Sequence, residues 1–394
     1  MLTPDRKDGT ENYMQENTKK NSTITRKIRN VFFLIAALAA GGAGGYALAV
    51  YTDISSGGKA TVWIVLFRII FIVFCVYMAF YLQAAFHEAG HMICALLSGY
   101  RFLSFRVGSF MWIRQDGRIR LRRFSLAGTG GQCLMDPPDL KNGQVPYILY
   151  NLGGALANLI TSLILIGGYL LFRGNWYLSA FLLTMAGVGL WLAAINGIPL
   201  KLGMMNNDGR NIIDIGKNKE EIYGFWVQMK IAVRQTEGVR LKDMPCEWFQ
   251  IPPAEEIRYP MTAARAVFAA NRLVDEHAFT EAAKLIDRIL RADADLIGLY
   301  RLLLIPDRVY CELIGERSTE ILDRWNDSQM QKFIRQMRNY PQMIRTEYAY
   351  TLLKEQDREK AERIRQKFEQ TAKSYPYSSD LESERELIEI AETL

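Results

Sequence analysis

Residues 86–95 read Phe-His-Glu-Ala-Gly-His-Met-Ile-Cys-Ala. On a helix, His87 and His91 are four residues apart and therefore lie on one face, one turn above the other. Two neutral imidazoles at this spacing can bind one zinc ion. Glu88 lies beside them and is a candidate general base.

The setting of this motif indicates a membrane helix. The chain is almost continuously apolar from Val62 to Leu97, and only Arg68, Gln83 and the motif interrupt the run. No Gly or Pro precedes Ala89 in this run, so we expect one long helix that spans the bilayer, over about residues 62–99. A carboxylate and two imidazoles are unfavourable in hydrocarbon, and such groups usually mark a functional site.

Three further apolar runs, over about residues 31–51, 145–172 and 177–198, predict three more membrane spans. We therefore expect an α-helical membrane protein with four transmembrane helices, preceded by a disordered cytosolic N-terminus at residues 1–30. Seven arginines fall within residues 101–123, and this excess of positive charge places the segment and both termini in the cytoplasm. The predicted location is the cell membrane of a bacterium.

The charge and cysteine content exclude some classes of protein. The net charge of +6 over 394 residues comes from clusters near the apolar runs, so we expect no nucleic-acid partner. The five cysteines are scattered and form no Cys-x-x-Cys pair, which argues against a disulfide framework or a structural zinc cluster.

The two polar regions have different patterns. In residues 101–135, apolar and polar residues alternate on either side of Gln115-Asp-Gly, which predicts a small membrane-associated β-hairpin region. Residues 216–260 contain four prolines near their end and are expected to be a linker region. Residues 261–394 predict a cytosolic all-α domain with helix pairs weakly similar to tetratricopeptide repeats, which could bind a cytosolic protein partner.

A catalytic zinc ion usually has three protein ligands and one open position. Asp208 follows the last span and the helix-breaking Pro199, and it is the candidate for the third ligand, with Asp214 as the alternative. Asn151 and Asn158 are about two helical turns apart on the third span and share a face. Their amides could contact a substrate backbone or water, or they could bond to another helix.

Three motifs resemble those of the site-2 proteases, a family of intramembrane zinc metalloproteases. They are Phe86-His-Glu-Ala-Gly-His91, the Gly-Gly-Ala-Leu-Ala-Asn stretch that ends at Asn158, and Asn196-x-x-Pro199 followed by Asp208-Gly209. The resemblance covers about residues 62–215. It implies a transmembrane zinc metalloprotease domain over residues 31–215.

The resemblance also implies roles for individual residues. His87, His91 and Asp208 would bind Zn²⁺, and Glu88 would be the catalytic base. The hairpin region, with Gly130 and Gly131, would hold an unwound substrate as an added strand, and Asn151 and Asn158 would pair with its backbone. The substrate would be a transmembrane or membrane-tethered peptide within the lipid bilayer.

The alternative is a catalytically inactive member of this family that serves as a membrane scaffold or peptide-binding protein. The eight residues between Pro199 and Asp208 form a longer insert than the family usually has, which favours this alternative. The intact Glu88 and both histidines oppose it.

Overall fold

The computed structural model describes residues 62–115, 117–125, 129–202, 205–253, 257, 259–291, 298–315 and 319–394. The described residues divide into two units between Phe74 and Cys75. The second unit contains every described element except the beginning of helix α2 (Val62–Leu97). The predicted N-terminal tail and the predicted span 31–51 lie outside the described residues.

Three of the described helices are long and apolar enough to cross a membrane: α2, α3 (Tyr147–Leu171) and α4 (Trp176–Gly197). The predicted spans at 62–99, 145–172 and 177–198 are thus confirmed as helices, with bounds that differ by one or two residues. A polar turn joins α3 to α4, where the Asn175 side chain accepts a hydrogen bond from the backbone N–H of Leu178 and caps α4.

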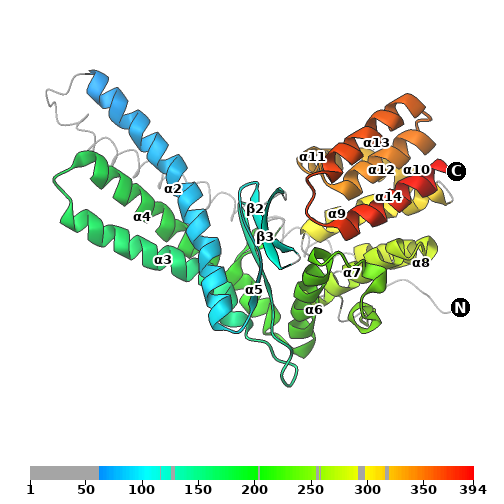
Figure 1. Ribbon diagram of the computed structural model, residues 1–394, viewed down its shortest axis with the longest axis horizontal. Helices are drawn as coiled ribbons and strands as arrows, with labels where there is room; N and C mark the ends of the chain where they lie inside the picture. Colours follow the sequence, from blue (N-terminus) through cyan, green and yellow to red (C-terminus); the bar gives the residue numbers. More distant parts are fainter. Residues whose placement is uncertain are drawn as a thin grey trace, which may run out of the picture. The chain divides into compact units, whose positions relative to one another are not determined.

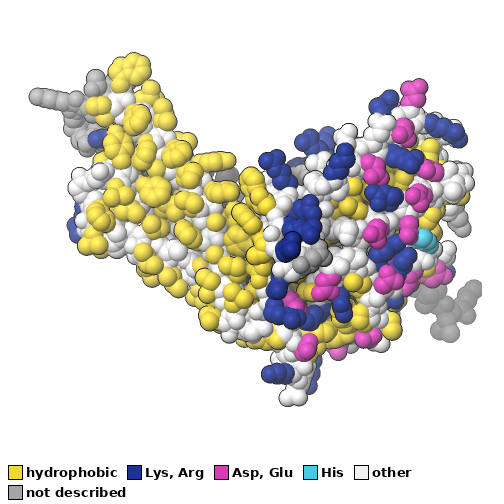
Figure 2. All heavy atoms as spheres, in the orientation of Figure 1, with side chains coloured by type: hydrophobic (Ala, Val, Ile, Leu, Met, Phe, Trp, Pro, Cys, Tyr) yellow, Lys and Arg dark blue, Asp and Glu magenta, His cyan; other side chains and the backbone are white. Residues whose placement is uncertain are grey.

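The spanning helices place apolar side chains outside and polar side chains inside. On α3, Leu163, Ile164 and Leu171 are more than half exposed, whereas Asn158 and Ser162 are completely buried. Figure 2 shows hydrophobic side chains over this part of the surface, while Lys, Arg, Asp and Glu gather over the C-terminal helices. This reversal of the usual pattern is favourable only where the surrounding solvent is lipid.

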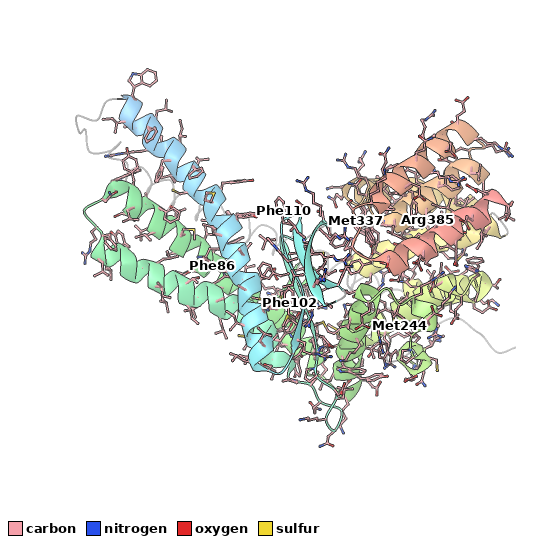
Figure 3. All side chains as sticks on the ribbon, viewed as in Figure 1. Phe86, Phe102, Phe110, Met244, Met337 and Arg385 are labelled. Carbon is pink, nitrogen blue, oxygen red and sulfur yellow. The ribbon has the colours of Figure 1, made fainter. Side chains whose placement is uncertain are left out.

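Strands β1 (Arg101–Val107), β2 (Phe110–Gln115), β3 (Arg118–Arg123) and β4 (Gly131–Asp136) form one antiparallel sheet in the order β3-β2-β1-β4. The predicted hairpin is the β2–β3 pair, in which Gln115 is opposite Arg118. The sheet is larger than predicted because β4 returns to pair with β1. Phe102 on β1 and Phe110 on β2 mark the sheet in Figure 3.

After α4, the chain forms the short strands β5 (Lys201–Leu202) and β6 (Met205–Asn206) and helix α5 (Asp208–Ile215). Helix α6 (Lys219–Thr236) then occupies much of the stretch that we expected to be a linker. It contacts β4 and α7, and Lys230 Nζ on α6 lies 2.8 Å from Asp136 Oδ1 at the end of β4. This stretch therefore joins the sheet to the helices that follow.

The rest of the described chain is helical, which confirms the predicted all-α character of residues 261–394, while the resemblance to tetratricopeptide repeats stays a prediction. Two hydrophobic clusters form its core, one around α6, α7 and α8 and the other around α9 to α14. Figure 1 shows these helices following one another along the chain. The elements are η1 (Leu241–Asp243), η2 (Cys246–Phe249), α7 (Pro260–Asp275), α8 (Phe279–Arg291), α9 (Gly298–Ile314), α10 (Thr319–Asp323), η3 (Arg324–Asn326), α11 (Ser328–Gln336), α12 (Pro341–Leu353), α13 (Arg358–Ala372) and α14 (Ser378–Glu392).

Candidate metal centre

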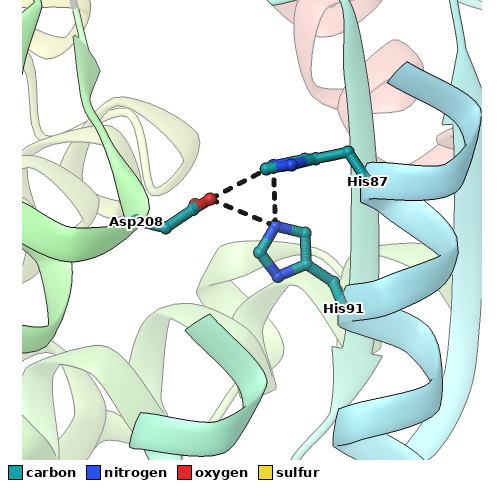
Figure 4. A group of neighbouring side chains, drawn as sticks. All are labelled: His87, His91 and Asp208. Carbon is teal, nitrogen blue, oxygen red and sulfur yellow. Dashed lines mark hydrogen bonds and ion pairs between the residues drawn. The ribbon is translucent and has the colours of Figure 1, made fainter. Parts of the chain in front are cut away.

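The side chains of His87, His91 and Asp208 meet at one point (Figure 4). Asp208 Oδ2 lies 3.1 Å from His87 Nε2 and 3.4 Å from His91 Nε2. The two Nε2 atoms are 3.1 Å apart. Helix α2 supplies both histidines from successive turns, and the carboxylate comes from the first residue of α5.

A hydrogen-bond chain fixes the tautomer of His87. Asn158 Nδ2 donates to both the backbone oxygen and the side-chain oxygen of Gln83, each at 2.8 Å. Asn158 Oδ1 therefore faces His87 Nδ1, at 2.8 Å. Because an amide oxygen only accepts, His87 Nδ1 carries the proton, and the lone pair of the neutral ring is on Nε2.

The same reasoning applies to His91, whose Nδ1 lies 2.7 Å from the carbonyl oxygen of Tyr150. A carbonyl oxygen only accepts, so the Nε2 atom of the neutral ring again carries the lone pair. Three electron-rich atoms thus face one another, and Asp208 Oδ2 has no hydrogen-bond partner among the described residues. Positive charge, from a proton on one ring or from a metal ion, is needed to stabilise this arrangement. Two imidazole nitrogens with one carboxylate oxygen suit zinc.

Asn207 holds Asp208 in place by capping α5. Its Oδ1 accepts from the backbone N–H groups of Arg210 and Leu200, at 2.9 and 3.0 Å. Its Nδ2 donates to the carbonyl oxygens of Ile195 and Ile198 at the end of α4. Asn207 therefore joins the start of α5 to the end of α4. The length of the insert between these helices does not prevent Asp208 from reaching the histidines.

The electrostatics of Asp208 favour the charged form. Burial raises the pKa of this carboxyl group, but when the imidazoles are protonated the charge of His91 and the hydrogen bonds from both rings outweigh burial and hold the pKa below its usual range. A bound metal cation would supply this positive charge in place of the protons. The group is therefore a carboxylate at neutral pH, as a metal ligand must be.

Asp214 is completely buried and bound elsewhere. Its Oδ1 atom lies 2.9 Å from Arg210 Nη2 and 2.9 Å from Lys217 Nζ, and its Oδ2 accepts from Asn206 Nδ2 at 3.0 Å. The described group of possible metal ligands contains Asp208 and not Asp214. The geometry thus favours Asp208 of the two alternatives.

Glu88 is nearly buried, and its carboxylate lies beside the backbone of Gly131 at the start of β4. A Cβ atom at position 131 would collide with the Glu88 side chain, so only glycine permits this approach. The buried Arg106 supports the same segment, because its guanidinium donates to Thr129 Oγ1 and to the carbonyl oxygen of Gly131. Glu88 is thereby held at the side of the histidines.

A cavity of about 710 Å³ opens at this centre. Its lining includes Glu88, the three candidate ligands and three of the four residues that we expected to contact substrate: Gly130, Gly131 and Asn151. The Asn151 side chain donates to the carbonyl oxygen of Tyr147, at 2.8 Å, one turn earlier on the same helix.

Asn158 differs from the expectation. It is completely buried, it does not line the cavity, and its polar atoms bond to Gln83 and His87. The sequence left two roles open for this residue, contact with a substrate or water and hydrogen bonding to another helix. The structure has the second, because Asn158 on α3 bonds to Gln83 and His87 on α2. Asn158 is therefore a positioning residue for His87 in this structure.

Sequence reasoning missed three residues that orient the centre: Gln83, Tyr150 and Asn207. Gln83 could have been found, because it is the polar residue one helical turn before His87 in an apolar run. Tyr150 acts through its backbone carbonyl, which has no sequence signal. Asn207 directly precedes an Asp-Gly pair, and asparagine at that position is a common helix cap.

Comparisons with known proteins identify one family. A protein-family model described as Peptidase family M50, the site-2 protease family, matches residues 75–374. This range includes the candidate centre, the sheet and most of the C-terminal helices. No curated protein and no solved structure matches the chain.

The two aspartates give the first prediction. Asp208→Ala removes one of the three ligand atoms. Loss of a residue that only hydrogen-bonds to a metal ligand typically lowers metal affinity by about 10–100-fold, so we expect a larger loss of zinc affinity here. Asp214→Ala is the matched control and should keep an affinity close to that of the wild type, because its carboxylate pairs with Arg210 and Lys217. Competition with a chromogenic chelator measures both. The reverse ranking would move the site to Asp214.

Proposed function

The chain belongs to peptidase family M50, and from this premise we propose that it is an intramembrane zinc metalloprotease that hydrolyses membrane-embedded peptides near the cytoplasmic face. The observation that carries the proposal is the convergence of three lone pairs, on His87, His91 and Asp208, beside Glu88. The family is one of metalloproteases, and the described helices suit a membrane protein.

In this proposal His87 Nε2, His91 Nε2 and Asp208 Oδ2 hold the zinc ion. Bound zinc polarises the carbonyl of a peptide bond and lowers the pKa of water. Asn158 and the Tyr150 carbonyl keep both rings oriented, because each accepts a hydrogen bond from Nδ1.

Glu88 is the general base and then the general acid. It takes a proton from the attacking water and passes it to the nitrogen of the leaving amine, so that the peptide bond breaks into a carboxylate and an amine. Glu88 lies on α2 with its carboxylate beside the start of β4, which supports this role because substrate in the cavity would lie next to it.

The substrate backbone needs hydrogen-bond partners once its helix unwinds. We assign this role to β4, because it is one of the two edge strands of the described sheet and, unlike β3, begins at Gly131, beside Glu88. A peptide added to that edge would gain backbone hydrogen bonds in the manner of β-augmentation. Gly130, Gly131 and Asn151 line the cavity, and among the described residues beyond its chain neighbours no atom lies within 4 Å of the position that a Cβ atom would take at Gly130.

A second prediction tests catalysis. Glu88→Gln should lower the rate of cleavage of a model transmembrane peptide by about 10²–10⁴-fold, because the amide cannot take a proton from water. The variant should retain one zinc ion per chain, since Glu88 is not a proposed ligand. Glu359→Gln, at a side chain that is 93% exposed on α13, is the matched control.

The outcomes separate the two candidate functions. If Glu88→Gln and the wild type cleave the peptide at equal rates, Glu88 is not the general base. If the wild type binds zinc and peptide but cleaves no peptide, the chain is the inactive scaffold that the sequence leaves as the alternative.

The orientation in the membrane is also a proposal, supported by the seven arginines within residues 101–123. Cys246, an exposed cysteine, is first replaced by serine so that it does not react. In intact cells that express this variant, a membrane-impermeant maleimide should label a cysteine introduced by Gly174→Cys, in the α3–α4 turn. It should not label Arg118→Cys, at the start of β3, because that side would face the cytoplasm. Labelling of Arg118→Cys from outside would reverse the orientation.

A further inference from the structure

The cavity at the metal centre extends into the C-terminal helices. Its lining includes Glu88 and Asp208 and continues along α6 to Tyr340, directly before α12, and to Asp380 and Glu384 on α14. All of these residues belong to the same compact unit. A peptide held at the metal centre therefore has one continuous space that leads away from the spanning helices.

Contacts between the sheet and the C-terminal helices define one wall of this space. Gln115 Nε2, at the end of β2, donates to the carbonyl oxygen of Pro376 at 2.7 Å. The Phe124 ring packs edge-on against the rings of Tyr375 and Tyr377, with centroids 5.9 Å apart in both pairs. The segment before α14 is thereby fixed against the sheet, and its tyrosines line the cavity.

The end of the cavity that is lined by Asp275, Asp307, Asp380 and Glu384 is called here the acidic end. The guanidinium groups of Arg240 and Arg345 lie among these four carboxyl groups. Arg345 pairs with Asp307 and Glu384, at 2.5 and 2.7 Å. Arg240 pairs with Asp275 and also with Glu386, a fifth carboxylate.

Asp380 differs from the other three carboxylates because its hydrogen-bond donors are neutral. Gln235 Nε2 donates to its Oδ1 at 2.9 Å, and the Tyr375 hydroxyl donates to its Oδ2 at 3.2 Å. Burial raises the pKa of Asp380 to about 7, and Glu384 adds to this effect while the Gln235 hydrogen bond opposes it. A cation bound at Asp380 would stabilise its charged form.

The aromatic wall favours a cation on an apolar stem. The Tyr340 and Tyr375 rings are 6.1 Å apart between centroids, and the Tyr375 and Tyr377 rings are 5.8 Å apart. Aromatic faces attract ammonium and guanidinium groups, and they also pack against the methylene chains of lysine and arginine.

We propose that the acidic end of this cavity binds the side chain of a lysine or arginine on the part of the peptide substrate that lies outside the bilayer. The inference rests on the proposed function, because it places the scissile bond at the metal centre. It gives the C-terminal helices a direct part in substrate selection. Asp380 is the specificity-determining residue, and Glu384 one turn later on α14 adds to the negative charge.

The test uses synthetic peptides with one transmembrane segment and a polar extension. A single lysine is moved along the extension one position at a time, and each peptide has a partner with norleucine at the same position. Binding is measured to the full-length, zinc-loaded Glu88→Gln variant in detergent, and kcat/KM is measured with the wild type. One position should give about tenfold tighter binding with lysine than with norleucine, and glutamate there should weaken binding.

Three variants connect this preference to Asp380. Asp380→Asn should reduce the lysine-to-norleucine ratio to about one, and Asp380→Lys should reverse the preference in favour of glutamate. Glu389→Gln changes the same charge at an exposed position of α14 and should keep the ratio of the parent. If Asp380→Asn does not fold, the comparison of lysine, norleucine and glutamate peptides on the parent chain still tests the proposal.

The result that overturns the inference is equal binding of lysine and norleucine peptides at every position, or an unchanged lysine preference in Asp380→Asn. The failure of the proposed function is distinct from this, because the wild type would then cleave neither lysine nor norleucine peptides. Binding to the Glu88→Gln variant would still report the charge preference in that case.

Discussion

The structure depends on three lone pairs that face one another inside an apolar bundle. The Nε2 atoms of His87 and His91 and the Oδ2 atom of Asp208 lie within 3.4 Å of one another. Electron-rich atoms repel strongly at such distances where the local dielectric constant is low. The arrangement therefore needs positive charge between the atoms, from a metal ion or from a proton on one of the rings, and it links helix α2 to the start of α5.

Contacts between several elements of the chain position these three atoms and Glu88. Gly90 and Gly153 allow α2 and α3 to approach so closely that a Cβ atom on either would collide with the other helix. This contact brings Asn158 to Gln83 and His87, and the Tyr150 carbonyl to His91. On the other side of the histidines, the sheet places Gly131 against Glu88. The base and the ligands are thus oriented by different elements.

Local signals in the sequence predicted the described spans and the histidine motif. Hydropathy is reliable for helices of this length, and the spacing of His87 and His91 fixes a shared face without any tertiary contact. The contact between Asn158 and Gln83 joins residues 75 positions apart, and nothing in either segment alone specifies it. Likewise, the pairing of β4 with β1 follows from long-range packing. Residues 216–260 were expected to be a linker region because of their prolines, but these prolines all lie beyond the end of α6.

The most direct test of the central claim is X-ray absorption at the zinc K-edge of the full-length, zinc-loaded protein. We expect one zinc ion per chain, with two imidazole nitrogens and carboxylate or water oxygens at about 2.0–2.2 Å. Cys133 lines the same cavity, and its thiolate would give a zinc–sulfur distance of about 2.3 Å. A sulfur ligand, or a spectrum without two histidines, would contradict the assignment of His87, His91 and Asp208.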